Sequence, residues 1–70
     1  MLESVRDDVY MTGVYAGKSC KELGLTEENI AKYLLEKNFE DPATSEYLRS
    51  DLSLQEREEL CFIFDQGAGK

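Results

Sequence analysis

The sequence contains no histidine and no tryptophan, and it has only two cysteines and one proline. Histidine is the most common general acid–base residue and a frequent zinc ligand, so its absence removes the usual parts of a hydrolytic or zinc site. The carboxylates fall mostly at expected helix starts and on expected solvent faces, where they cannot act together as acid and base. We therefore expect no enzymatic activity, no cofactor and no metal site.

Long apolar runs are also missing, and so is the alternation of apolar and polar residues that is typical of strands. The N-terminal residues lack a basic region followed by an apolar stretch, which argues against a secretory signal. We expect a cytoplasmic protein whose cysteines, Cys20 and Cys61, are reduced thiols that pack as small apolar side chains. A single disulfide between them is the alternative.

Basic residues are scarce, since 8 lysines and arginines stand against 15 acidic residues and give a net charge of −7. Protein affinity for nucleic acid comes largely from cations that neutralise phosphates, so this balance argues against strong nonspecific DNA binding. The charge is uneven, however. Residues 17–38 carry four lysines and four glutamates, and most of the acidic excess follows them.

The spacing of apolar residues predicts an all-α fold, a compact bundle of four or five short helices in one domain over residues 1–66. Residues 67–70 are expected to form a flexible tail. The expected helices cover residues 3–16, 20–23, about 26–37, about 42–49 and about 54–65. Gly13 lies inside the first of these, where it either weakens the helix or lets a neighbouring helix approach closely.

Local signals mark most of the helix ends. Gly17 and Gly24 are expected to end the first two helices, and Thr26 to cap the third. Asp41 followed by Pro42 predicts the next start, and Ser53 with Glu56 fits a capping box.

The apolar pattern also predicts a core. Leu23, Leu25, Ile30 and Leu34 are expected to be buried together. On the last helix the expected buried residues are Leu54, Leu60, Cys61 and Phe64. Phe62 is expected to point outward, with Ile63 at the margin.

Residues 17–38 have the layout of a helix-turn-helix, in which a short helix, a glycine bend and a longer helix follow one another. The segment resembles the helix-turn-helix of response-regulator output domains and of the promoter-reading region of sigma factors. The resemblance covers about residues 5–35 and lies in three runs: Val14–Ser19, Lys21–Glu27 and Ile30–Leu34. The stretch Leu52–Leu60 resembles the helix that precedes the motif in response regulators, either by chance or because the chain is part of a longer protein.

The resemblance implies DNA binding and transcription control. The side chains that would contact bases are Thr26, Glu28, Asn29 and Lys32, and those that would contact phosphates are Lys18 and Lys21. Because the chain is acidic, such binding should be weak for a monomer and would need a dimer or a tethered partner.

Two other functions remain open at this point. The first is an acidic, phage-like adaptor or inhibitor that targets a nucleic-acid-processing protein through a basic surface of that partner. Its interface, which also suits a homodimer, would comprise Glu56, Glu58, Glu59, Phe62 and Ile63. The second is a structural subunit that buries its surplus aromatic residues in an oligomer.

Overall fold

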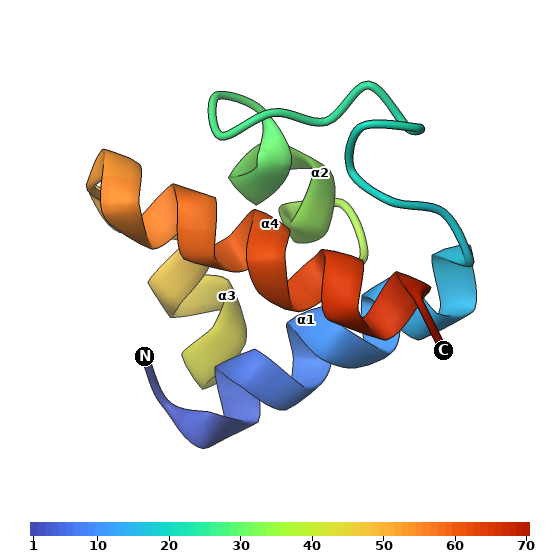
Figure 1. Cartoon of the computed structure of the whole chain (residues 1–70). Coiled ribbons are helices and arrows are strands. Elements are labelled where there is room, and N and C mark those ends of the chain that lie inside the picture. Colours follow the sequence, from blue (N-terminus) through green and yellow to red (C-terminus); the bar gives the residue numbers. More distant parts are fainter.

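The computed structural model describes residues 1–70 and contains four α-helices and no strand, which confirms the all-α prediction. The helices are α1 (Glu3–Ala16), α2 (Ile30–Leu35), α3 (Pro42–Arg49) and α4 (Leu54–Ala68) (Figure 1). The fifth expected helix, over residues 20–23, is instead a series of turns. None of the four helices has the length and apolar character needed to cross a membrane.

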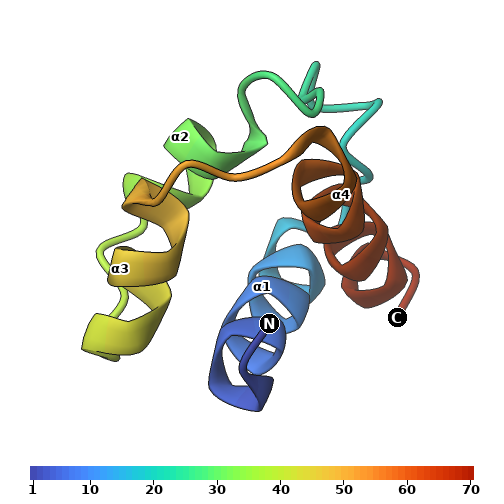
Figure 2. The same ribbon diagram turned by 90° about the vertical axis from the view of Figure 1, so that its left-hand side faces the viewer.

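The closest contact in the fold is the crossing of α1 and α4, which run in a similar direction beside each other (Figures 1 and 2). A Cβ atom added to Gly13 would meet the carbonyl oxygen of Phe64 at 2.1 Å, and one added to Gly67 would meet the carbonyl oxygen of Tyr10 at 2.0 Å. Neither distance is tolerable for a side chain, so only glycine allows the two backbones to touch here. The sequence prediction that Gly13 admits a close neighbour is therefore confirmed.

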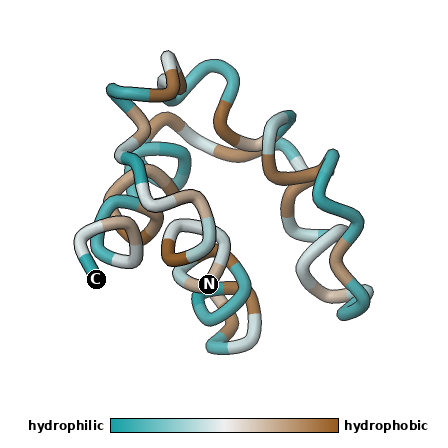
Figure 3. The backbone as a smooth tube through the Cα atoms, turned by 90° about the vertical axis from the view of Figure 1, so that its right-hand side faces the viewer, coloured by the Kyte–Doolittle hydropathy of each residue, from teal (hydrophilic) through white to brown (hydrophobic).

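The core lies between this helix pair and the second pair, α2 and α3, which Figure 2 shows on the opposite side of the molecule. Hydrophobic residues recur among hydrophilic ones along the helices (Figure 3). On α1 and α4 the buried residues recur at the spacing of one helical face. The most completely buried apolar side chains are Val5, Val9, Ile30, Leu34, Leu60 and Phe64. Tyr33 packs its ring edge against Phe64 with 6.0 Å between the ring centroids.

Three predicted helix ends are confirmed. Gly17 ends α1 in the left-handed conformation, with φ of 66°. The Asp41 carboxylate accepts a hydrogen bond of 2.9 Å from the backbone N–H of Ala43, just before Pro42 begins α3. Ser53 and Glu56 form the expected capping box at the start of α4.

The prediction for the third helix was wrong at its start, because α2 begins at Ile30 rather than just after Thr26. The Thr26 hydroxyl accepts a hydrogen bond from the N–H of Glu28, and the Asn29 side chain accepts one from the N–H of Thr26. These bonds stabilise a turn over residues that were expected to be helical. Ile30 and Leu34 are buried as predicted, but Leu25 is only half-buried and Leu23 is exposed.

The prediction for the chain end was also wrong, because α4 continues to Ala68 and Gly67 is buried against α1. Residues 67 and 68 are therefore part of the helix and not of a flexible tail. The inward stripe of α4 comprises Leu60, Ile63, Phe64 and Gly67. Ile63 was predicted at the margin of the core, but it is only 2% exposed and belongs to this stripe. Leu54 was predicted to be buried, but it is exposed at the start of the helix.

The close contact of α1 and α4 at Gly13 and Gly67 predicts that one added methyl group at either glycine lowers the stability severely. Gly13→Ala and Gly67→Ala should each destabilise the protein by about 3 kcal/mol or more, because a Cβ atom would collide with backbone that cannot rotate away. Gly69→Ala is the matched control, because its Cβ atom would lie 3.7 Å from its nearest neighbours. Urea unfolding measures the difference, and equal stability of Gly67→Ala and Gly69→Ala would contradict the crossing.

The burial of the core residues predicts different losses of stability at Ile30 and Leu23, which were both expected to be buried. Ile30→Ala should cost about 2–4 kcal/mol, since Ile30 is fully buried and its removal leaves a cavity. Leu23→Ala should cost far less, because 36% of Leu23 is already exposed. Thermal unfolding followed by circular dichroism tests both, and an unchanged melting temperature for Ile30→Ala would refute its place in the core.

Candidate functional site

The outer face of α4 presents an aromatic ring among carboxylates. Phe62 is 61% exposed, although it stands between the half-buried Cys61 and the buried Ile63. Its neighbours one helical turn away, Glu58 and Asp65–Gln66, are exposed as well, and so is Glu59. Residues three or four positions apart lie next to each other on a helix, so these side chains form one surface. We call Glu58, Glu59, Phe62 and Asp65 the α4 face.

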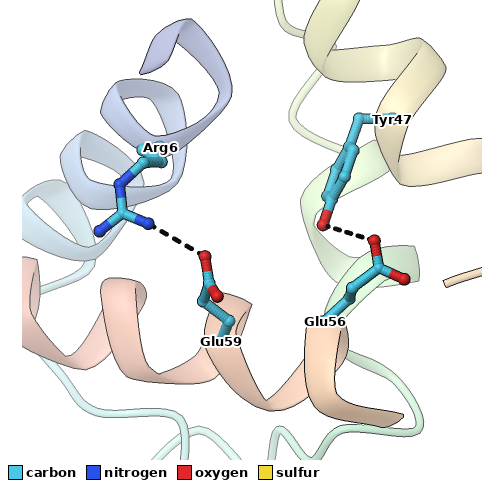
Figure 4. A network of polar contacts seen from close by, with 4 residues as sticks. All are labelled: Arg6, Tyr47, Glu56 and Glu59. Carbon is cyan, nitrogen blue, oxygen red and sulfur yellow. Dashed lines mark hydrogen bonds and ion pairs between the residues drawn. The ribbon is translucent and has the colours of Figure 1, made fainter. Parts of the chain in front are cut away.

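Neighbouring helices hold the carboxylates beside this face (Figure 4). Arg6 of α1 forms an ion pair of 3.0 Å with Glu59. The Tyr47 hydroxyl of α3 donates a hydrogen bond of 3.4 Å to Glu56, whose other oxygen accepts one of 2.9 Å from the N–H of Ser53. Partial burial, and then the nearby Glu56 carboxylate, raise the pKa of Tyr47. Glu56 therefore serves to connect α3 and α4.

The structure separates the five residues that were expected to form a protein interface. Glu58, Glu59 and Phe62 are exposed together on α4, Glu56 is half-buried against Tyr47, and Ile63 is in the core. Ile63 is therefore excluded from any surface, because it lies on the inward stripe. Asp65 was missed by the sequence analysis, although its spacing of three residues from Phe62 places it on the same face.

All six side chains that the helix-turn-helix resemblance assigns to DNA are exposed: Lys18, Lys21, Thr26, Glu28, Asn29 and Lys32. Only Lys32 lies in an α-helix, however. The Asn29 amide is engaged on both sides, since its oxygen accepts from the N–H of Thr26 at 2.7 Å and its nitrogen donates to the Gly24 carbonyl at 3.3 Å. It would have to give up both bonds to pair with a base.

The segment between α1 and α2, residues 17–29, is attached to α4 by polar contacts. The N–H of Cys20 donates a hydrogen bond of 2.8 Å to the Asp65 carboxylate, and Arg57 donates one of 3.4 Å to the carbonyl of Glu27. Cys20 itself is buried, and its Sγ atom lies 4.0 Å from the carbonyl oxygen of Cys61. These contacts give a segment without regular helix a fixed position.

A groove of about 600 Å³ lies on another part of the surface, between α1 and the region around the end of α2. It is lined by Asp8, Met11, Thr12, Tyr15, Ala16, Tyr33, Lys37 and Phe39. The Lys37 ammonium lies 4.6 Å from the centre of the Tyr33 ring, in a cation–π contact. Sequence reasoning missed this groove, and the only signal for it was Met11 and Tyr15, spaced four residues apart on the polar side of α1.

No group of three or more histidine, cysteine, aspartate or glutamate residues is placed to hold a metal ion. No known protein family matches this sequence, and comparisons with curated proteins and with solved structures also gave no match. The function must therefore be argued from the surface itself.

Acid should destabilise the protein partly through Glu22 and Glu56. Hydrogen bonds from the backbone N–H groups of Ser19 and Ser53 hold the pKa of these two carboxyls below their ordinary range. Their contribution is present above the pKa of the unfolded chain, about 4.3, and is lost as the pH falls through the lower folded-state pKa. The melting temperature of Glu56→Gln should therefore depend less on pH below about 5 than that of the wild type.

The matched control for this experiment is Glu58→Gln, because Glu58 is exposed on the same helix and its side chain takes no part in the hydrogen bonds that hold the Glu56 carboxyl. Calorimetric scans over a pH series give the comparison. Identical pH profiles for Glu56→Gln and the wild type would mean that the capping carboxylate does not carry the effect.

Proposed function

We propose that this chain is a small acidic binding module that recognises a positively charged surface of another protein through the α4 face. The observation that carries the proposal is the Phe62 ring, which is 61% exposed and surrounded by Glu58, Glu59 and Asp65. A large exposed apolar group rimmed by polar residues is typical of an interaction site. The ring adds apolar contact area, and the carboxylates add charge.

The chemistry of the α4 face favours arginine as its main contact. A guanidinium group can stack on an aromatic ring and at the same time donate paired hydrogen bonds to a carboxylate. Phe62 with Glu58 or Asp65 beside it offers both interactions within one helical turn. Glu59 already pairs with Arg6, so a partner arginine would compete with an internal one for that carboxylate.

The net charge of the whole chain supports the same proposal. A charge of −7 on 70 residues produces a negative potential over most of the surface. Such a potential accelerates association with a basic partner and slows it with an acidic one. Nucleic-acid-processing proteins commonly carry basic surfaces, because those surfaces bind phosphates. The module would therefore suit the role of an adaptor or inhibitor of such a protein.

DNA binding through residues 17–32 is the second candidate function. It is favoured by the exposure of Lys18, Lys21 and Lys32 and by the helix-turn-helix resemblance. The local bonding of Asn29 and the absence of α-helix over residues 17–29 weigh against it. For these reasons we place the α4 face first.

The proposal predicts that Phe62→Ser weakens binding of a synthetic arginine-rich peptide about 3- to 30-fold, the range expected for loss of a cation–π contact. Fluorescence anisotropy at low and moderate salt gives the affinity. Tyr15→Ser is the matched control, because Tyr15 is also an exposed aromatic residue, at 82%, but lies away from the α4 face on α1. It should leave the affinity unchanged.

The same measurement separates the two candidate functions. Glu58→Lys should weaken peptide binding and reduce its salt dependence, since it reverses one charge of the α4 face. If Phe62→Ser and Tyr15→Ser bind the peptide equally well, the affinity is a property of net charge alone and the proposed site is wrong. Binding of duplex DNA at low salt that is lost in Lys21→Ala and Lys32→Ala would favour the second candidate instead.

A further inference from the structure

The two cysteines are brought together from distant parts of the sequence. Cys20 lies in the segment between α1 and α2, and Cys61 lies on α4, 41 positions later in the sequence. Cys20 contacts α4 twice, through its Sγ atom at 4.0 Å from the Cys61 carbonyl and through its N–H at 2.8 Å from Asp65. Because Cys61 and Asp65 are one helical turn apart, Cys20 lies against the stripe that they share.

The thiols themselves interact. Burial, and then the neighbouring Cys61 thiol, raise the pKa of Cys20. Burial also raises the pKa of Cys61, while a hydrogen bond with the Cys20 thiol opposes that rise. Both thiols are free, Cys20 is 4% exposed and Cys61 is half-buried. Cys61 is thus the thiol that solvent reaches first.

Hydrogen bonds hold the backbone around Cys20 beside α4. A disulfide needs the two Cα atoms about 4.4–6.8 Å apart and a narrow range of torsion angles. Residues 20–24 form turns in which the Cys20 carbonyl accepts from the N–H groups of Leu23 and Leu25 at 3.1 and 2.7 Å, and the Cys20 N–H is bonded to Asp65, so the Cys20 thiol is kept close to Cys61. The partner residue lies on a 15-residue helix, which keeps Cys61 in place.

We propose that Cys20 and Cys61 form an intramolecular disulfide when the protein meets a small-molecule disulfide such as oxidised glutathione. The Cys61 thiolate attacks one sulfur of the oxidant and releases one molecule of reduced glutathione, leaving a mixed disulfide on Cys61. The Cys20 thiol then loses its proton as it attacks the Cys61 sulfur, and the second glutathione is released. The two thiol protons leave with the two glutathione thiolates, so the protein dithiol is oxidised and the oxidant is fully reduced.

This modification would fix residues 17–29, the segment between α1 and α2, to α4. It does not depend on the proposed function. The bond would add a covalent link between residues 17–29 and α4 to the hydrogen bonds that already join them. It would also close a long loop in the unfolded chain, which stabilises the folded state. Asp65, which accepts from the Cys20 N–H, would stay fixed at the edge of the α4 face.

Intact-protein mass spectrometry after incubation with oxidised glutathione at mildly alkaline pH tests the proposal. We expect the wild type to lose the mass of two hydrogens with no glutathione adduct, and to regain it with dithiothreitol. The melting temperature should rise by about 10 °C, as expected for a disulfide that closes a long loop in a small domain.

Two variants give matched comparisons. Cys20→Ser should accumulate a single glutathione adduct on Cys61, because the second attack is lost. Cys61→Ser should react far more slowly, because Cys20 is buried. A wild type that stays unmodified, that keeps one adduct, or that forms a covalent dimer would overturn the proposal, and each of these results is read from the wild-type spectrum alone.

Discussion

The contact of the α1 and α4 backbones at Gly13 and Gly67 is the constraint on which the rest of the fold depends. Each glycine faces a carbonyl of the other helix, so the two approach more closely than helices with side chains at the crossing can. This approach fixes which stripe of α4 turns inward, and Leu60, Ile63 and Phe64 follow from it. Phe62 must then point to solvent, because one α-helix cannot bury four consecutive residues on one face.

Two carboxylates near the start of α4 are bonded to side chains of other helices. Arg6 of α1 contacts Glu59 and Tyr47 of α3 contacts Glu56, so Glu59 links α4 to α1 and Glu56 links the two helix pairs. Exposed ion pairs contribute little stability, and here the effect is mainly one of orientation. Glu58 and Asp65 are exposed on either side of the one exposed ring of α4, and the Asp65 carboxylate also accepts from the N–H of Cys20.

The sequence predicted the fold class, three helix ends and the outward direction of Phe62, because glycine, Asp-Pro and Ser-x-x-Glu act locally. The predictions were wrong where contacts between residues far apart in the sequence determine the local structure. The turn over residues 17–29 is held by α4 through Cys20 and Arg57, and Gly67 is helical because α1 lies against it. The layout of a helix-turn-helix predicted a short helix over residues 20–23, where the structure has turns. The contact of Cys20 with Cys61 entered the sequence analysis only as the alternative of a single disulfide, since no local pattern joins residues so far apart.

The ring of carboxylates around Phe62 has a consequence for the free protein in solution. Two copies that met through their α4 faces would bring like charges together around the ring, and the repulsion would oppose their pairing. The same side chains that suit a cationic partner thus oppose self-association through Phe62. Salt or acid weakens this repulsion. The solubility of the free chain and the selectivity of its surface therefore depend on the same few carboxylate oxygen atoms.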